Sequence, residues 1–386
     1  MDGRVDAIKF VHTADWHLGR RMISLRDSDG YPLQFRWAED AGNQIADFAA
    51  DFGADIVFLC GDILNRADPS PTVENILARI LRRILSAGAK VVYLLGNHEV
   101  PREGDHPAKI YATLGIEGVI VADSARVYPV ELAGGRVLQV VALPYLYGVN
   151  PDEVLRELVA QVDPDKPAVV LAHAYVTGAK LSGSDASYVL EGPQISPATI
   201  SDLPVDYVAL GHIHRHQQVW TNPPAVYPGS IQRVTFAEAD EQKGFVAGRI
   251  FLDTPRRVQW EFVPIPSVPF VKVEVDLTRS EVSEPVEKIL SALKEVPAGA
   301  VAKLSVYLPR AISLPLVKIR KLARKSGIYL VAIEIHRVEM EEVSGHSAPR
   351  PTGDIVEDIS RYVRSARPDL VDELPQIIEV VREFID

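Results

Sequence analysis

Short runs of β-branched and other apolar residues alternate with amphipathic segments from the N-terminus to about residue 260. Each run is too short for a helix and is followed by polar residues or glycine, which predicts buried strands that end in turns. The expected strands are Ala7–Thr13, Ile56–Leu59, Val91–Leu95, Val137–Ala142, Val169–Ala172 and Tyr207–Leu210. Val73–Leu85 places apolar residues at helical spacing and predicts an amphipathic helix. This alternation predicts an α/β or sandwich-like fold with ligands at the strand ends.

A proline-rich stretch, Val263–Phe270, separates this region from a second pattern. From Phe270 to about Met340, three strand-like runs alternate with two helical segments, which predicts a small βαβαβ domain. A linker composition follows, and then two helical stripes separated by the residues ARPD. The expected division is 1–265, 270–342, a linker at 343–353, and a tail at 354–386. A helical pair of this size buries little apolar surface alone, so we expect the tail to pack on the body or on a partner.

Composition indicates a globular protein of more than one domain. The chain has 386 residues, and its 47% hydrophobic and 24% charged content exclude a disordered chain. The single cysteine, Cys60, excludes an intrachain disulfide and suits a reducing cytoplasm. The N-terminal residues lack the features of a signal peptide, and no apolar run reaches about 18 residues, so we expect no membrane span.

The net charge of −11 argues mildly against nucleic acid as a partner, because phosphate contacts need Lys and Arg. Binding depends on local patches, however, and Leu314–Gly327 is basic without any acidic residue. Its apolar residues recur at helical spacing, which predicts a helix with a basic exposed face. The basic residues are Lys318, Arg320, Lys321, Arg324 and Lys325. A solvated surface helix and a phosphate-binding helix both fit this pattern.

Side chains that commonly bind metals follow five of the expected strands at the point where each strand ends. In chain order they are Asp15, His17, Asp62, Asn97, His98, His173, His212 and His214. Any one of them is common in a surface turn, but five such coincidences at the same end of the strands indicate one shared site. Imidazole with carboxylate suits Mn²⁺, Fe²⁺ or Zn²⁺ better than an all-oxygen Mg²⁺ or Ca²⁺ site. Six or seven ligands exceed what one tetrahedral ion accepts, which favours two ions that share a carboxylate.

These residues resemble the five motifs of the calcineurin-like metallophosphoesterases in identity, order and spacing. The motifs are D-x-H from Asp15, G-D at Asp62, G-N-H-E around Asn97, the single His173, and G-H-x-H from Gly211. The stretch TADWHLGR, Thr13–Arg20, also resembles the SbcD-type nucleases of DNA double-strand-break repair. The resemblance extends over nearly the whole chain but is specific only in the body. It implies a β-sandwich flanked by helices, a small βαβαβ cap domain and a helical C-terminal tail.

The resemblance also implies a role for each of these residues. One ion would be held by Asp15, His17, Asp62 and His214, and the other by Asp62, Asn97, His173 and His212. His98 would stabilise the transition state or protonate the leaving oxygen. The implied cofactor is two Mn²⁺ ions, with Fe²⁺, Zn²⁺ or Mg²⁺ as substitutes. His216 has no implied role, and we expect it at the rim of the site or behind the ligands.

Two positions depart from the family pattern. Asn65 stands where the family often has an acidic residue or histidine, and Glu99 stands where SbcD-type relatives usually have aspartate. Glu99 and Arg66 are reminiscent of the Ser/Thr protein phosphatases, but Ala67 and the TADWHLGR stretch argue against that class. His106 is expected to be structural or at the surface.

The implied function is Mn²⁺-dependent DNA cleavage in double-strand-break repair, as a 3′→5′ exonuclease on duplex ends and an endonuclease on single strands or hairpins. The implied partners are DNA, an SbcC-type ABC ATPase bound by the C-terminal helices, and a second copy of the chain. Relatives dimerise through helices near Val73–Leu85. The implied location is the cytoplasm, in association with the nucleoid. The alternative is a phosphatase or small-molecule phosphodiesterase on the same dinuclear site, which would not need the cap and the tail.

Overall fold

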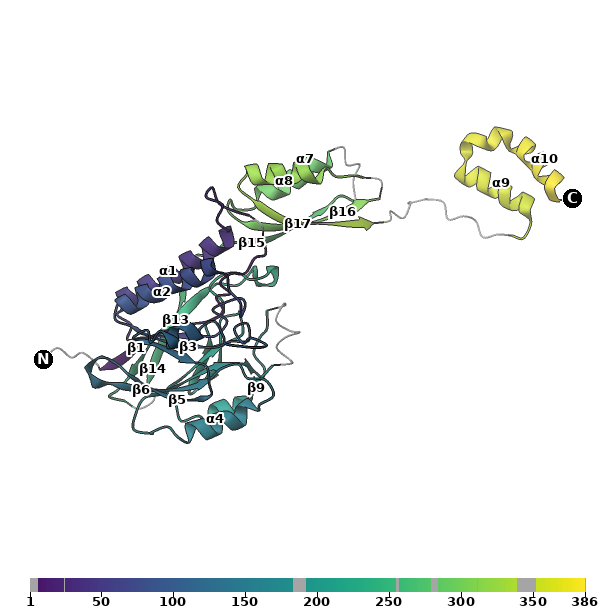
Figure 1. Cartoon of the computed structure of the whole chain (residues 1–386). Helices are drawn as coiled ribbons and strands as arrows, with labels where there is room; N and C mark the ends of the chain where they lie inside the picture. The colour runs from purple at the N-terminus through teal and green to yellow at the C-terminus, as the bar shows by residue number, and fades with distance from the viewer. Residues whose placement is uncertain are drawn as a thin grey trace.

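The computed structural model describes residues 6–23, 25–182, 192–254, 257–278, 284–310, 312–338 and 352–385. Two packed sheets with helices outside them form the largest part (Figure 1). A three-stranded sheet with two helices and a C-terminal helical pair follow in the chain. Within the described residues, no helix combines the length and the apolar character needed to cross a membrane.

The first six-stranded sheet carries the N-terminal strands in its middle. Its order is β14 (Val258–Pro264), β13 (Gly244–Phe251), β1 (Ala7–Thr13), β2 (Ile56–Cys60), β3 (Lys90–Leu94) and β4 (Val119–Ala122). Strands β1 to β4 are parallel, and β13 pairs antiparallel with both β1 and β14. Helices α1 (Leu33–Phe52) and α2 (Pro71–Ser86) supply apolar side chains to the core on its outer face.

The second six-stranded sheet has a parallel centre with antiparallel edges. Its order is β11 (Gln217–Thr221), β12 (Pro224–Tyr227), β10 (Tyr207–Gly211), β7 (Ala168–His173), β6 (Val137–Leu143) and β5 (Arg126–Glu131). Helices α4 (Pro151–Val159) and α6 (Pro197–Ser201) contribute to the core on its outer side. The remaining short elements of the body are α3 (Lys109–Thr113), η1 (Ala133–Gly135), β8 (Tyr175–Val176), β9 (Gln194–Ile195) and η2 (Phe236–Glu238).

A fully buried apolar layer joins the inner faces of the two sheets. Phe10 and Phe58 from the first sheet pack with Leu171 and Tyr207 from the second. His12 is buried in the same layer, where its Nε2 donates to the Leu210 carbonyl (3.0 Å) and its Nδ1 lies 3.1 Å from the Tyr207 hydroxyl. Burial lowers the pKa of His12 to about 3, so the ring stays neutral. Its two hydrogen bonds join the first sheet to the second.

The cap sequence folds as the βαβαβ unit that its pattern predicts. Its elements are β15 (Phe270–Asp276), α7 (Pro285–Lys294), β16 (Val301–Pro309), α8 (Leu316–Lys325) and β17 (Tyr329–Val338). The three strands are parallel in the order β15-β16-β17, and they enclose a core of their own with both helices. In α8, Ile319 and Ala323 are buried while all five basic residues are exposed, which confirms the predicted basic face.

The tail contains two helices, as expected, with a 3₁₀ segment between them. They are α9 (Ile355–Ala366), η3 (Pro368–Glu373) and α10 (Leu374–Ile385), and α9 contacts α10. Asp354 caps α9 by accepting from the backbone N–H of Val356 and Glu357. The expected linker lies outside the described residues, apart from 352 and 353.

The six strands and the helix expected for the body are all present, with ends shifted by two residues or fewer. The pattern analysis did not assign α1, whose buried stripe consists largely of Ala38, Ala41, Ala46 and Ala49. It also did not assign β13, which contains two glycines. At one of them, Gly248, an added Cβ would lie 2.4 Å from the Phe10 ring, so packing across the sheet determines that residue.

Candidate metal centre

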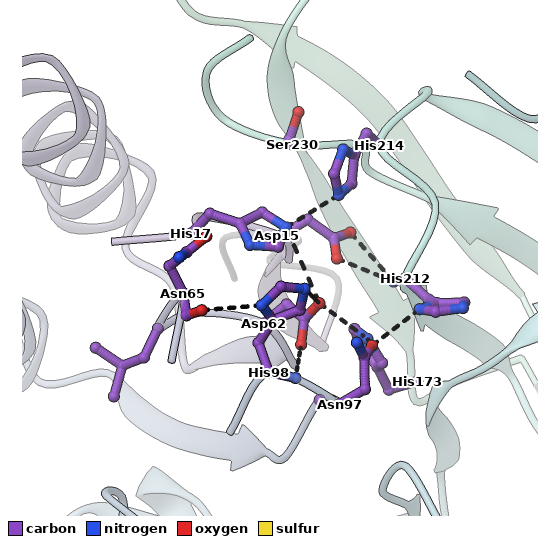
Figure 2. A network of polar contacts seen from close by, with 12 residues as sticks. Asp15, His17, Asp62, Asn65, Asn97, His98, His173, His212, His214 and Ser230 are labelled. Atoms are coloured by element: carbon purple, nitrogen blue, oxygen red, sulfur yellow. Dashed lines mark hydrogen bonds and ion pairs between the residues drawn. The ribbon is translucent and has the colours of Figure 1, made fainter. Parts of the chain in front are cut away.

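The eight residues predicted for the site lie together where five parallel strands end (Figure 2). Strands β1, β2 and β3 bring their carboxyl ends to one edge of the first sheet, and β7 and β10 do the same in the second. The sheets approach closely at this edge. A Cβ on Gly211 would lie 1.9 Å from the Cys60 carbonyl oxygen, and one on Gly96 would lie 2.2 Å from Asp62 Oδ1. Glycine in the G-H-x-H and G-N-H motifs therefore permits the contact between the loops.

Asp62 lies in the middle of the cluster. Its Oδ2 is 3.6 Å from His173 Nε2, 3.9 Å from His17 Nε2 and 3.9 Å from His98 Nε2. The potential ligand atoms form three groups within 4.8 Å, and Asp62 belongs to two of them. One carboxylate thus faces histidines from both sheets, which is the position that a bridging ligand requires.

The remaining donors divide into two sides of Asp62. On one side, His17 Nε2 and His214 Nε2 are 3.0 Å apart, and Asp15 completes the group. On the other side, Asn97 Oδ1 is 3.2 Å from both His173 Nε2 and His212 Nδ1. Two groups of potential donors thus lie on either side of Asp62.

Four of these residues adopt a left-handed backbone conformation that side chains normally avoid. Their φ angles are 54° at Asp15, 46° at His17, 52° at Asp62 and 99° at His212. Each such residue costs about 1–3 kcal/mol and persists only where its surroundings enforce it. Backbone hydrogen bonds between the loops enforce the conformation here: Asp15 N donates to Gly61 O and His17 N donates to Asp62 O, both at 3.0 Å.

Burial and mutual charge separate the pKa values of the cluster. Burial lowers the pKa of His17 and takes that of His212 to about 3, so both rings are neutral and keep a lone pair. Burial raises the pKa of Asp15 to about 7. Burial also acts to raise the pKa of Asp62, but His173 and its neighbours outweigh burial and hold that pKa below its usual range. His173 shows the reverse balance, because Asp62 and Asp15 raise its pKa to about 9 despite burial.

The chemistry of the cluster fits metal ions. Two imidazole nitrogens about 2.0–2.1 Å from one ion lie roughly 3 Å apart when they meet at about a right angle. His17 and His214 have this separation. Neutral imidazoles, carboxylates and an amide oxygen are also the donor types that divalent transition metals accept.

His98 lies beside the cluster and is more open to solvent than the other histidines there. Its side chain is 35% exposed, and its Nδ1 donates to the Asn65 carbonyl at 2.9 Å. Nδ1 carries the proton for that bond, and Nε2 faces the cluster, 3.9 Å from Asp62 Oδ2. The contact uses the backbone of Asn65, so the unusual side chain at this position leaves the orientation of His98 intact.

Glu99 has a role that sequence analysis did not identify. It is fully buried, and its carboxylate accepts from the backbone N–H of Asp62 (3.0 Å), Leu64 (2.9 Å) and Gly96 (2.8 Å) and from the Tyr93 hydroxyl (2.7 Å). It therefore ties the loop after β2 to the loop after β3. The position of Glu99 as the fourth residue of the G-N-H-E motif is the sequence feature that could have indicated this role.

Glu238 also supports the cluster, and no motif marks it. Its Oε1 accepts from His214 Nδ1 at 3.1 Å, and its Oε2 lies 2.7 Å from Lys243 Nζ. His216 is directed elsewhere: its Nδ1 donates to the Tyr227 carbonyl (2.9 Å), and its ring stacks on Phe262 with centroids 4.1 Å apart. His106 pairs with Asp123 at 3.3 Å, as a structural residue would.

Comparison with known proteins agrees with this geometry. Residues 8–216, more than half of the chain, match the family model of the calcineurin-like phosphoesterases. The chain therefore belongs to the calcineurin-like phosphoesterase family, which is a family of enzymes with a dinuclear metal site.

Several relatives are named nucleases or repair proteins. The chain is 24% identical over 264 residues to the SbcD component of the SbcCD nuclease of Staphylococcus epidermidis, covering 62% of this chain and 65% of that relative. The Bacillus subtilis SbcD component is 26% identical over 263 residues, which cover 61% of this chain and 64% of that relative. The DNA double-strand break repair protein Mre11 of Methanopyrus kandleri is 24% identical over 396 residues, which cover 98% of this chain and 82% of that relative. The chain thus spans slightly less than two thirds of the length of the two SbcD relatives.

We predict that Glu99→Ala destabilises the body by at least about 3 kcal/mol, because three buried N–H groups lose their acceptor at about 1–3 kcal/mol each. For a domain of this size the melting temperature should fall by roughly 6–12 °C. Differential scanning calorimetry in chelator measures the change without a contribution from metal. Exposed Glu103 lies on the same loop, and Glu103→Ala serves as the matched control. Equal melting temperatures for the two variants would contradict the proposed anchoring.

Proposed function

We propose that this protein is a metal-dependent DNA nuclease that acts in double-strand-break repair. The observation that carries the proposal is the convergence of donors from five strand ends on Asp62, with His98 beside them. The names of the relatives support DNA as the substrate, and the similarity to the Mre11 protein extends over 98% of the chain. Residues 1–265 would form the nuclease domain, acting on chromosomal DNA in the cytoplasm.

We assign one ion to Asp15, His17, Asp62 and His214, and the other to Asp62, Asn97, His173 and His212. We propose Mn²⁺ for both positions, with Fe²⁺, Zn²⁺ and Mg²⁺ as substitutes to be tested. When bound, such a pair supplies hydroxide at neutral pH and neutralises charge on the phosphoryl oxygens.

The chain itself contributes His98 to the reaction. The Asn65 carbonyl holds the ring by its Nδ1 proton, so Nε2 is available to a phosphodiester at the open side of the cluster. Protonated at Nε2, the ring stabilises the developing negative charge or gives its proton to the leaving 3′- or 5′-oxygen. Cleavage proceeds 3′→5′ on duplex ends and endonucleolytically on single strands or hairpins.

A phosphatase or small-molecule phosphodiesterase on the same site is the second candidate. The cluster chemistry fits that function equally well, because phosphate monoesters and diesters present the same oxygens to the metal pair. The cap and the tail favour the nuclease, since a small substrate needs neither. The exposed basic face of α8 adds a surface that suits the backbone of DNA.

We predict that His98→Ala lowers Mn²⁺-dependent cleavage of a labelled blunt duplex by about 10²–10⁴-fold, the usual contribution of a general acid. Metal content should remain that of the wild type, because His98 is not assigned as a ligand. Nucleotide release is measured with Mn²⁺, with Mg²⁺ and with chelator, and bound metal by plasma mass spectrometry. His106→Ala, which removes a histidine outside the cluster, is the control. Intact DNA alongside hydrolysis of an aryl phosphate would instead identify the phosphatase.

For the cap we predict that Lys321→Ala with Lys325→Ala weakens duplex binding independently of sequence. Both side chains are exposed on one face of α8. Each lost phosphate contact should reduce the slope of log affinity against log salt by about 0.9. Fluorescence anisotropy over a salt series measures the slope, and hydrolysis of an aryl phosphodiester should be unchanged. Lys294→Ala on α7 is the control. An unchanged slope in the double variant would show that the basic face of α8 is an ordinary solvated surface that does not contact DNA.

We further propose two protein partners. The tail at 354–386 would bind an SbcC-type ABC ATPase, supported by apolar side chains that α9 and α10 leave exposed, such as Ile355 (54%) and Val380 (54%). A second copy of the chain is the other partner. The apolar stripe of α2 is buried in its own core. The exposed residues Ile110 (55%) and Leu114 (65%) in and after α3 are therefore the better candidates for dimer contacts.

Sedimentation velocity tests both partners. The full chain should sediment as a dimer at micromolar concentration, and Ile110→Glu with Leu114→Glu should shift it toward one chain. Added ATPase should form a larger complex with the full chain but not with a chain that ends before residue 352. A single-chain mass for the wild type would refute the dimer, and a complex formed without the tail would refute its proposed role.

A further inference from the structure

The segment 230–243 follows the last metal-ligand motif and forms a buried polar layer behind His214. Glu238 and Lys243 are 0% and 1% exposed. Lys243 Nζ lies 2.7 Å from Glu238 Oε2 and 2.9 Å from Glu241 Oε2, and it donates to the His214 carbonyl at 3.1 Å. Removing one member of a buried ion pair leaves an uncompensated charge in the core, which destabilises the fold. Glu238 and Lys243 therefore depend on each other.

Glu238 is held rigidly by neighbours other than Lys243. Its Oε2 also accepts from the backbone N–H of Val234 at 3.0 Å and from the Ser230 hydroxyl at 3.3 Å. Its Oε1 accepts from the Thr235 hydroxyl at 3.3 Å and from His214 Nδ1 at 3.1 Å. A carboxylate with this many donors has one orientation, and it imposes that orientation on the imidazole bonded to it.

The bond to Glu238 determines which nitrogen of His214 is available. The carboxylate accepts the proton of Nδ1, so Nε2 keeps its lone pair and faces His17 Nε2 at 3.0 Å. A carboxylate behind a metal-binding imidazole fixes its tautomer and increases its basicity.

Arg233 fixes the same segment to the chain that enters the cap. Its Nε donates to the carbonyls of Glu238 (3.2 Å) and Ala239 (3.1 Å), and its Nη2 to that of Glu241 (2.8 Å). Its Nη1 donates to the Ser267 hydroxyl (2.6 Å) and the Val268 carbonyl (3.1 Å), just before β15. One guanidinium thus joins the backbone around Glu238 to the start of the cap.

We propose that Glu238 is a positioning residue for metal binding, which orients His214 toward the ion that it shares with Asp15 and His17, and that Arg233 holds Glu238 in place from the cap entrance. The inference rests on the proposed dinuclear site and adds residues that its motifs do not contain. Because His214 belongs to one ligand set only, the loss of Glu238 should affect one ion and leave the other.

Calorimetric titration of the metal-free full chain with MnCl₂ tests the proposal. The wild type should bind two ions. Glu238→Gln should weaken one of them by about 10–100-fold, the usual effect of removing such a partner, and leave the other within about 3-fold. Electron paramagnetic resonance at two equivalents of Mn²⁺ should show a coupled pair in the wild type and a mononuclear signal in the variant. Glu241→Gln, which removes the other carboxylate on Lys243, is the matched control and should retain the coupled pair.

Each other outcome decides against a stated part. Two tight ions in both the wild type and Glu238→Gln would overturn the positioning role and leave the proposed function standing. A wild type that binds no Mn²⁺ pair would overturn both. Equal losses of Mn²⁺ affinity in the Glu238 and Glu241 variants would show that metal binding depends on neutralising the charge of Lys243 and not on the contact between Glu238 and His214. If circular dichroism shows that Glu238→Gln is unfolded, Arg233→Met decides: weaker binding of one ion supports the proposal, and wild-type binding of both overturns it.

Discussion

The close approach of the two sheets at the ends of β2 and β10 is the constraint on which the site depends. The Cys60 carbonyl at the end of β2 accepts from His173 Nδ1 at 2.8 Å, across the gap between the sheets. It also leaves no space for a side chain at Gly211. Because ladder pairing aligns β1 with β2 and β7 with β10, this one contact brings donors from both sheets within reach of Asp62. The strained loops at Asp15, Asp62 and His212 are the local consequence of turning inward at that edge.

Two buried glutamates stabilise the opposite sides of this cluster in different ways. Glu99 accepts backbone N–H groups and so fixes the course of the loops that carry Asp62 and Asn97. Glu238 accepts an imidazole N–H and so fixes one ring. Burial raises the pKa of Glu99, and nearby Asp62 adds to that effect, whereas hydrogen bonds from the Gly96 and Leu64 amides oppose it. These contacts position the candidate ligands without a metal ion, and none of them uses an atom that is a candidate metal ligand.

The parts of the chain are separate in their cores but are joined by particular side chains. The three-stranded sheet has its own apolar core, yet Phe270 at its first residue packs with Ile23 of the body, and Arg233 binds the segment just before it. The cap therefore meets the body on the chain segment that also carries Glu238. Arg233 thus connects the segment behind His214 to the domain that carries the basic helix α8.

Much of this was determined by the sequence alone. Strand runs, the periodicity of α2 and α8, and the polar residues after each strand are local patterns. They predicted the sheets, the cap and eight polar residues that the structure brings together at the strand ends. What depends on distant contacts was not predictable. The buried stripe of α1 is largely alanine, which forms helices well but gives a weak apolar periodicity, and glycine weakens the strand pattern of β13. Packing against Ile80 leaves no space for a side chain at Gly42 of α1, and packing against Phe10 leaves none at Gly248 of β13. Glu238 lies 24 residues beyond His214 without any motif, so only the tertiary structure brings its carboxylate to the ring. The backbone bond from Asn65 to His98 was equally hidden, because a main-chain carbonyl leaves no mark in the sequence.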